Sequence, residues 1–395
     1  MNIRRLGSSP QIPIIVILTL IYWCGANSIA PFMSLFVKDI NLTILQTSFF
    51  LGGVAITRII IQPIIGLFIG KINENHAMTM ALLLLALSSL SYALFKNFYV
   101  LLGFRLVEGI AMGSFMIASR ILINNFSYNE ISVINNYSSG MKNLGTFMGP
   151  ALAGLLIESM GIKSIFFVSC FIFVIGFYLA TKIQPLNSKQ IDGTEDLSDT
   201  QKIPKRVPYL FFIMLLHSIE FIGLGLWLAG WPVYANSELN WSSGKIGFSF
   251  SIMAISGGAI VYLIGNKFKA FSKLKIIIGL TLLAIPPILV IHAKNNELLI
   301  WVGLSLGGIG ATIYFANFHT YISTLLRKKE VPIFYGLIGT FTFAGQAIGL
   351  ALTPILWANF SYGIPIIVDY ILLILDSCLY LLFFYVPYLY KQVVN

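Results

Sequence analysis

Charged residues are scarce in this chain, and their scarcity excludes most soluble proteins. Asp, Glu, Lys and Arg together make up only 10% of the 395 residues, whereas an ordinary soluble domain carries about 25%. Cysteine and histidine are scarce as well: the three cysteines lie far apart in apolar runs, and the four histidines are scattered. Neither a disulfide framework nor a zinc spacing is present, so we expect no metal and no cofactor.

A phosphate-binding glycine loop is also missing, which argues against ATP as the direct energy source. A membrane-embedded enzyme such as a lipid transferase would need clustered carboxylates or histidines at a membrane surface, and the sequence shows none. We therefore predict a protein that is not an enzyme. The net charge of +10 does not indicate nucleic-acid binding in so apolar a chain; what matters is where the cations lie relative to a membrane.

Hydrophobic residues, by contrast, make up 57% of the chain, with a mean hydropathy of +0.86. A helix that crosses the hydrocarbon core needs about 20 mostly apolar residues and satisfies its own backbone hydrogen bonds. Twelve segments qualify, at residues 12–36, 47–70, 77–95, 98–123, 137–158, 163–182, 209–234, 245–265, 275–293, 298–325, 332–357 and 363–389. The sequence thus predicts an all-α integral membrane protein with twelve transmembrane helices. The first run is too long for a signal-peptide core, and we interpret it as the first span.

Lys and Arg in the connecting segments give the orientation. With a cytoplasmic N-terminus, the inner segments hold sixteen of the 25 Lys and Arg residues and the outer loops only five. Both termini are therefore expected in the cytoplasm, beneath the cell membrane. The polar stretch 184–208 predicts a cytoplasmic linker between a six-helix bundle at 1–183 and a second at 209–395. Two such halves around a midplane site are typical of secondary transporters, and they complete a cavity within one chain, so we expect a monomer.

Arg105 and Glu108 lie three residues apart inside the fourth span, in the stretch RLVEGIAMG. Charged side chains at a bilayer centre cost roughly 2.5–3.5 kcal/mol each on insertion scales, so they are functional candidates. At this spacing the two side chains meet on one helix face. Two interpretations remain open. The pair is a proton switch in which the charge of Glu108 changes, or it is a permanent ion pair that fixes the helix register.

The fifth span contains GTFMGPALAG, residues 145–154. Gly145 and Gly149 leave one helix face bare, so a neighbouring helix can approach closely. Pro150 removes a backbone donor and bends the helix. This combination predicts a hinge or seal between the halves, with ordinary helix packing as the alternative.

Along its whole length the chain resembles the major facilitator superfamily in these features. Proton-coupled members carry an Arg-x-x-Gln-Gly pattern in the fourth span. Arg105 and Gly109 match it with Glu108 in place of Gln, and the resemblance implies a part in proton coupling for Arg105. The segment QPIIGLFIGKINEN, residues 62–75, is similar to the family's cytoplasmic gating loop but lacks its aspartate and later basic residues. The usual charge relay of that loop is therefore not expected here.

The fifth span resembles the Gly-x-x-x-Gly-Pro signature of the family's antiporters. Gly145, Gly149 and Pro150 match it, and Ala153 takes the place of a later glycine. The resemblance implies an antiporter and disfavours a nutrient symporter.

Three further cations lie inside predicted spans. Arg58 is in the middle of the second span, so it should face the cavity or pair with an acid. Arg120 lies near the cytoplasmic end of the fourth span and Lys142 in the first turn of the fifth. Both are near enough to a membrane surface to extend their charged ends into it.

The second half supplies the acids. Glu220 is the strongest candidate, with His217 three residues before it as a group that titrates near neutral pH. Asp376 is expected deep in the twelfth span and Asp369 nearer the outer surface. The remaining candidates for the substrate cavity are Asn27, His217, Trp227 and Gln346.

Charge balance points to the substrate. Exporters of lipophilic cations need acids in the membrane, whereas the first half holds four intramembrane cations against Glu108. We therefore expect proton-coupled export of a small anionic molecule, such as a carboxylate siderophore, by alternating access of the two halves. A multidrug exporter of broad apolar specificity is the main alternative. A non-transporting receptor also remains open, because one gating loop is degraded.

Overall fold

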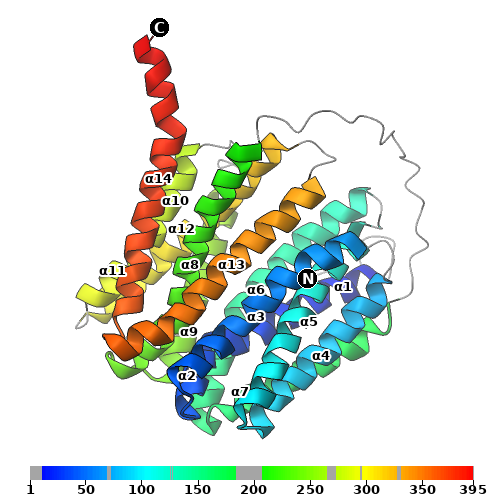
Figure 1. Ribbon diagram of the computed structural model, residues 1–395. Helices are drawn as coiled ribbons and strands as arrows, with labels where there is room; N and C mark the ends of the chain where they lie inside the picture. Colours follow the sequence, from blue (N-terminus) through cyan, green and yellow to red (C-terminus); the bar gives the residue numbers. More distant parts are fainter. Residues whose placement is uncertain are drawn as a thin grey trace.

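The computed structural model describes residues 11–68, 73–124, 126, 128–183, 207–264, 273–293, 296–326 and 331–394. Every regular element within these ranges is a helix (Figure 1). We call α1 to α7 the N-terminal half: α1 (Gln11–Ile29), η2 (Ala30–Phe32), α2 (Met33–Asp39), α3 (Ile44–Phe68), α4 (Glu74–Leu94), α5 (Phe98–Asn124), α6 (Tyr128–Met160) and α7 (Lys163–Ala180). The C-terminal half consists of α8 (Val207–Ser237), α9 (Ser243–Ile264), α10 (Lys273–Leu283), α11 (Ile285–His292), α12 (Glu297–Leu325), α13 (Val331–Asn359) and α14 (Ile364–Val394).

Ten helical segments of the described residues are long and apolar enough to cross a membrane, which confirms an all-α, multi-pass architecture. They coincide with ten of the twelve predicted spans. The other two predicted spans, 137–158 and 245–265, fall on α6 and α9. These helices pack against α1 and α12 respectively, and the count of twelve stays a prediction. Most of the predicted linker, 184–206, lies outside the described residues.

Three spans differ from their predicted form, and the first of them, predicted as one run at 12–36, is divided into α1, η2 and α2. Helix α6 begins at Tyr128, nine residues before the predicted start at 137, because a helix outside the hydrocarbon core needs no continuous apolar run. The predicted span 275–293 is broken into α10 and α11 at Ala284. Pro286 and Pro287 lie in the first turn of α11 and cannot donate backbone hydrogen bonds to the turn before them.

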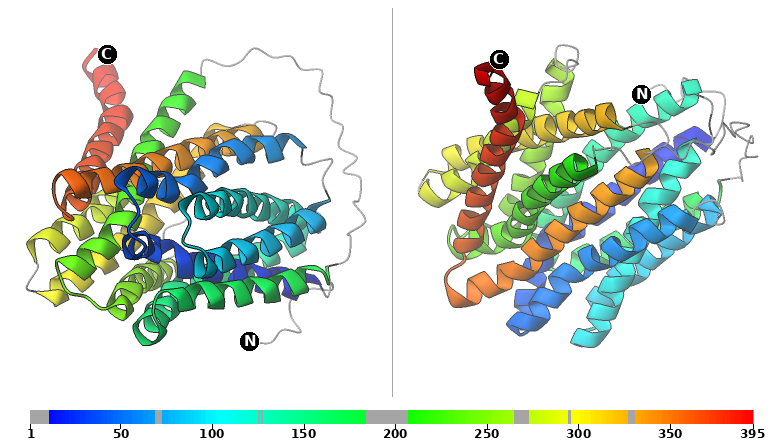
Figure 2. Two further views of the ribbon diagram at one scale, coloured as in Figure 1. Left: turned by 60° about the horizontal axis from the view of Figure 1, so that its bottom comes forward. Right: turned by 45° about the horizontal axis from the view of Figure 1, so that its top comes forward.

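The two halves meet along two pairs of helices, α3 with α13 and α6 with α9. Figure 2 shows α3 and α13 running side by side in both views. Between α6 and α9 the approach is so close that a Cβ on Gly247 would clash with the carbonyl of Pro150. The Ser251 hydroxyl also donates to the Phe147 carbonyl at 2.7 Å. The end of the glycine-proline stretch therefore lies in backbone contact with the other half.

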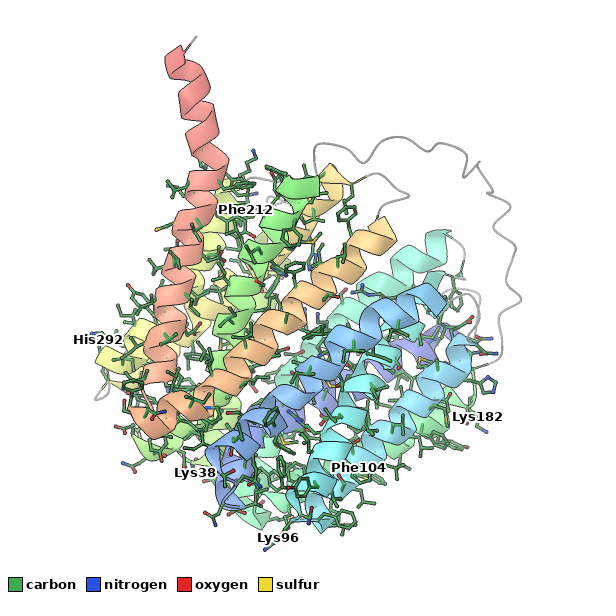
Figure 3. The ribbon with its side chains drawn as sticks, viewed as in Figure 1. Lys38, Lys96, Phe104, Lys182, Phe212 and His292 are labelled. Carbon is green, nitrogen blue, oxygen red and sulfur yellow. The ribbon has the colours of Figure 1, made fainter. Side chains whose placement is uncertain are left out.

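Other contacts join the helix ends that the sequence places outside the cell. Lys38 Nζ donates to Ser237 Oγ at 2.8 Å, and a Glu158 carboxylate oxygen accepts from the backbone N–H of Gly244 at 3.2 Å. Lys38 and Lys96, both predicted in outer loops, lie at the lower end of the bundle in Figure 3. The hydrogen bonds and ring contacts that join the halves among the described residues extend from this end to Phe147 and Arg58. Among the described residues, the end of the molecule that the sequence predicts to lie outside the cell is thus closed.

Candidate transport site

Arg105 and Glu108 form a buried ion pair on α5, with Arg105 Nη1 2.7 Å from Glu108 Oε2. The same oxygen accepts a hydrogen bond from the Tyr92 hydroxyl of α4 at 2.5 Å. Arg105 Nε donates to the Phe50 carbonyl of α3 at 3.2 Å. The pair is 6% and 7% exposed, so three helices are tied together through a closed polar network. In this conformation the geometry is that of the structural alternative, and a switching role for Glu108 stays a hypothesis.

Gly145 and Gly149 of α6 lie against the backbone of α1. A Cβ on Gly145 would stand 2.8 Å from the Cys24 nitrogen, and one on Gly149 would stand 2.7 Å from the Cys24 carbonyl oxygen and 3.0 Å from the Ser28 nitrogen. Such distances leave no room for a side chain. The bare face predicted from the sequence thus packs within the N-terminal half, while Pro150, one residue on, faces α9. Whether this helix acts as a hinge remains a prediction.

Arg58 of α3 lies at the boundary between the halves. Its guanidinium carbon is 3.7 Å from the ring centroid of Phe343 on α13, a cation–π contact. Its Nε is buried without an acceptor, and no described carboxylate pairs with it. The sequence predicted a residue that faces the cavity or pairs with an acid; the structure gives it an aromatic ring from the opposite half. Its charged neighbour is Glu108, and Tyr22 lies close as well.

Three acids are buried in the C-terminal half: Glu220 of α8, and Asp369 and Asp376 of α14, with exposures of 3%, 3% and 0%. Both aspartates are electrostatic neighbours of Glu220. One Glu220 oxygen and both Asp376 oxygens have no hydrogen-bond partner in the described structure. The sequence suggested that Asp369 lies nearer the outer surface, and the structure corrects this. Asp369 is buried because Gly223 of α8 leaves space that the Asp369 carboxylate fills.

His217 and Trp227 are both buried residues of α8. His217 Nδ1 is 2.8 Å from the Tyr314 hydroxyl, and the imidazole stacks on Phe318 at 3.9 Å between centroids. His217 therefore interacts with aromatic side chains of α12 and not with Glu220. Trp227 stacks on Trp231 at 5.3 Å, and its indole N–H has no partner in the described structure.

The two amides predicted for the cavity are half-buried. Asn27 Nδ2 donates to the Trp23 carbonyl of its own helix at 2.7 Å, so this donor is already used. Gln346 lies where α13 packs on α8, and its backbone carbonyl oxygen is 2.6 Å from the position that a Cβ on Gly225 would take. Contact of either amide with a substrate stays a prediction.

The sequence missed Tyr92 and misplaced Lys142. Tyr92 is a neutral residue in another span, and no spacing rule links it to Glu108. Lys142 was expected in the first turn of its helix, but α6 starts at Tyr128, so Lys142 lies about four turns further on. Its Nζ stands 4.4 Å over the ring of Trp23 on α1, which is a contact inside the bundle. The gating-loop positions 69–72 lie outside the described residues.

Comparison with known proteins identifies the family. The profile of the Major Facilitator Superfamily matches residues 15–350 and 213–394. The chain belongs to the Major Facilitator Superfamily. Among the superfamily's characterised members, the quinolone resistance protein NorA of Staphylococcus aureus is 22% identical over 341 residues, which cover 82% of this chain and 84% of NorA. The multi-drug resistance efflux pump PmrA of Streptococcus pneumoniae is 21% identical over 346 residues, covering 85% of this chain and 86% of PmrA.

Solved structures of the superfamily show the same fold. A bacterial homolog of the human lysosomal transporter Spinster, inward-facing and unoccupied, superposes with a TM-score of 0.73 at 12% identity over 95% of this chain and 98% of its own. The nucleoside transporter NupG superposes with a TM-score of 0.69 at 11% identity over 94% and 99%. The chain is therefore a multi-pass membrane transporter of the major facilitator type and not an enzyme.

Proposed function

We propose that this protein exports a small anionic molecule, such as a carboxylate siderophore, in exchange for protons. One observation carries the proposal: the unpartnered charged groups are segregated, with a cation at the boundary on the N-terminal side and acids in the C-terminal half. Transport by a monomer, with both termini in the cytoplasm and two six-helix halves rocking around a midplane site, belongs to the same proposal.

Arg58 supports the anionic substrate. An arginine within the membrane marks a substrate or ion pathway by default. No described acid neutralises it, and its side chain is partly exposed at the boundary of the halves. A carboxylate is the group that a guanidinium binds best, because two parallel N–H donors match two oxygens. Binding of a substrate carboxylate would replace the ring of Phe343 as the partner of this cation.

Glu220 and Asp376 support proton coupling. An ionised carboxylate without a partner is costly in apolar surroundings, so uptake and release of a proton is the natural event at such a group. In the described part of the C-terminal half no cation forms an ion pair with either acid, and the ion pair of Lys245 with Glu297 is exposed. Glu108 is a weaker candidate, since Arg105 and Tyr92 already satisfy it.

A multidrug exporter is the second candidate, and the similarity to NorA and PmrA favours it. The C-terminal half offers stacked rings for aromatic drugs, with Trp227 on Trp231 and Trp241 on Trp301 at 5.3 and 4.8 Å. In that case the buried acids would attract cationic compounds directly.

Export into everted membrane vesicles under an imposed pH gradient tests these alternatives. The substrates are a carboxylate siderophore, a quinolone and a cationic dye. The variants are Glu220→Gln, Asp376→Asn, Glu108→Gln and Arg58→Gln, with Glu297→Gln as the control for an exposed acid on α12. We expect gradient-driven siderophore transport in the native protein and in Glu297→Gln, and its loss in Glu220→Gln, Asp376→Asn and Arg58→Gln.

Each outcome decides a different element of the proposal. Dye movement without siderophore movement would discard the anionic substrate and make the protein a drug pump. Siderophore transport that is indifferent to the pH gradient would discard proton coupling. Loss of coupling in Glu108→Gln alone would return the proton role to the pair on α5.

A further inference from the structure

A second group of basic side chains comes from helices of both halves, at positions that the sequence predicts to be nearer the cytoplasm than Arg58. Lys142 extends from α6 over the Trp23 ring of α1, and its side chain is exposed. Arg120, near the end of α5, is its charged neighbour and is exposed as well. The ammonium group of Lys142 is thus in contact with the Trp23 ring, and among the described residues no acid forms an ion pair with it.

The C-terminal half contributes to the same group. His319 of α12 is exposed, and Arg120 and Lys142 are among its charged neighbours. Helices α5 and α6 belong to the N-terminal half and α12 to the C-terminal half, so these three side chains approach one another across the boundary of the halves. An imidazole donates an N–H to an anion in either protonation state, so it adds a donor to the two cations.

Like charges that converge in this way repel one another, and water or a mobile anion must offset the repulsion. Extension of the side chains to lipid headgroups is the usual reason for basic residues near a membrane surface. Here Lys142 lies over the Trp23 ring of the neighbouring helix α1. Both Lys142 and Arg120 are charged neighbours of His319 in the other half. Both features direct the charges to the inside of the protein rather than to lipid.

We propose that Arg120, Lys142 and His319 form an anion-binding site on the inner side of the transport path, which selects small molecules with two or more carboxylates. The inference rests on the proposed export of anions and names their class. Arg58 is a separate cation, because its neighbours are Tyr22 and Glu108 and not Lys142. A substrate with one carboxylate engages either Arg58 or this inner site. A polycarboxylate engages both positions and gains the affinity of a bivalent ligand.

Binding of citrate and gluconate to the purified full chain tests the inference. Both are small hydroxy acids that do not cross membranes, with three carboxylates and one respectively. The protein is placed in nanodiscs of phosphatidylcholine, with and without phosphatidylglycerol, and affinities are measured by calorimetry at low salt. We expect citrate to bind about tenfold more tightly than gluconate, and the preference to shrink in high salt because exposed charges are screened.

The variants are Arg120→Gln, Lys142→Gln and His319→Ala, with Lys142→Arg as the charge-preserving variant. Lys245→Gln is the matched control, since Lys245 is an exposed lysine paired with Glu297 at the outer side. Each of the three neutral variants should weaken citrate binding roughly threefold to tenfold and change gluconate binding less. Lys142→Arg and Lys245→Gln should keep the native preference, and unchanged thermal unfolding without ligand shows that all variants are folded.

Three results would overturn the inference. These are equal affinity for citrate and gluconate, an equal loss in Lys245→Gln, or neutral variants that lose bound phosphatidylglycerol by native mass spectrometry while citrate binding is kept. If gradient-driven export of a monocarboxylate survives any of these results, the proposed function stands and only the polycarboxylate site fails. If neither anion binds and only a cationic dye is exported, the proposed function fails as well.

Discussion

Arg58 on α3 and Phe343 on α13 are in contact across the boundary of the two halves, with 3.7 Å between the guanidinium carbon and the ring centroid. This contact belongs to the closed outer side, where α3 and α13 pack along each other. A desolvated cation–π contact is worth up to about 2 kcal/mol. The pair therefore stabilises the conformation in which the two halves are in contact at this position.

Phe343→Leu is predicted to shift the protein towards the outward-open state. Loss of the ring removes up to about 2 kcal/mol from the closed outer side, so the outward-open fraction should rise by up to roughly thirtyfold. Spin labels at the outer ends of α3 and α13 report the change as a longer distance. Phe341→Leu is the control on the same helix, because Phe341 packs on Phe211 within one half. Equal shifts in both variants would mean that general packing, not the cation–π contact, closes this side.

Removal of Arg105 should destabilise the protein strongly. Arg105→Gln leaves Glu108 buried without its cation, and breaking a buried pair in this way costs about 3–5 kcal/mol. The double variant Arg105→Gln, Glu108→Gln should recover most of the loss, because no charge remains buried. Thermal unfolding in detergent measures both. A double variant as unstable as the single one would contradict the ion-pair account of this network.

Tyr92 is predicted to orient Glu108. Its hydroxyl donates to the carboxylate at 2.5 Å, and hydrogen bonds to charged groups contribute about 1.5–3 kcal/mol. Tyr92→Phe should lower stability by this amount while it leaves export by a pH gradient nearly unchanged. Loss of coupling at normal stability would instead favour a proton path through Tyr92 and Glu108.

Gly149→Ala should be far more damaging than Gly140→Ala on the same helix. A methyl group at Gly149 would meet the α1 backbone at 2.7 Å, whereas at Gly140 nothing lies within 4 Å. Overpacking of this kind costs roughly 1–3 kcal/mol, while the second change adds only helix propensity. Unfolding temperatures of the two variants check this, and similar values would show that α1 and α6 separate easily.

The outer contacts of Lys38 and Glu158 predict an effect on conformation rather than on stability. Lys38→Met removes one polar contact between the halves and Glu158→Gln reduces the other to a neutral hydrogen bond; each contact is worth about 0.2–1 kcal/mol. The outward-open population should increase several-fold, as measured by spin-label distances. Lys245→Met with Glu297→Gln is the control, since that exposed pair lies within one half. If both double variants change the outward-open population equally, surface charge and not the contacts of Lys38 and Glu158 between the halves governs this equilibrium.

Hydropathy was sufficient to predict most of the helices, because a membrane-spanning segment must be apolar wherever it packs. It missed the first nine residues of α6, which are polar, and the break at Ala284, where prolines follow. Isolated charges such as Arg58, Glu220 and Asp376 were identifiable as candidates because each is costly in lipid.

Partners of those charges were not predictable, because they come from other helices. Nothing in the sequence relates Phe343 to Arg58 or Tyr92 to Glu108. Neighbours in the sequence were also misleading: His217, three residues before Glu220, stacks on Phe318 instead. Asp369 is buried only because a glycine of α8 stands opposite it, and this is a property of packing between helices.

The separation of Arg58 from the buried acids Glu220 and Asp376 also has an electrical consequence if the protein exchanges an anion for a proton. If a monovalent anion leaves as one proton enters, two elementary charges move across the membrane in the same electrical sense. Each gains about 2.3 kcal/mol per 100 mV when the cell interior is negative. The membrane potential alone would then drive export when the pH is equal on both sides. A neutral compound exchanged for a proton would receive half of this driving force, and every additional carboxylate on the exported molecule would add to it.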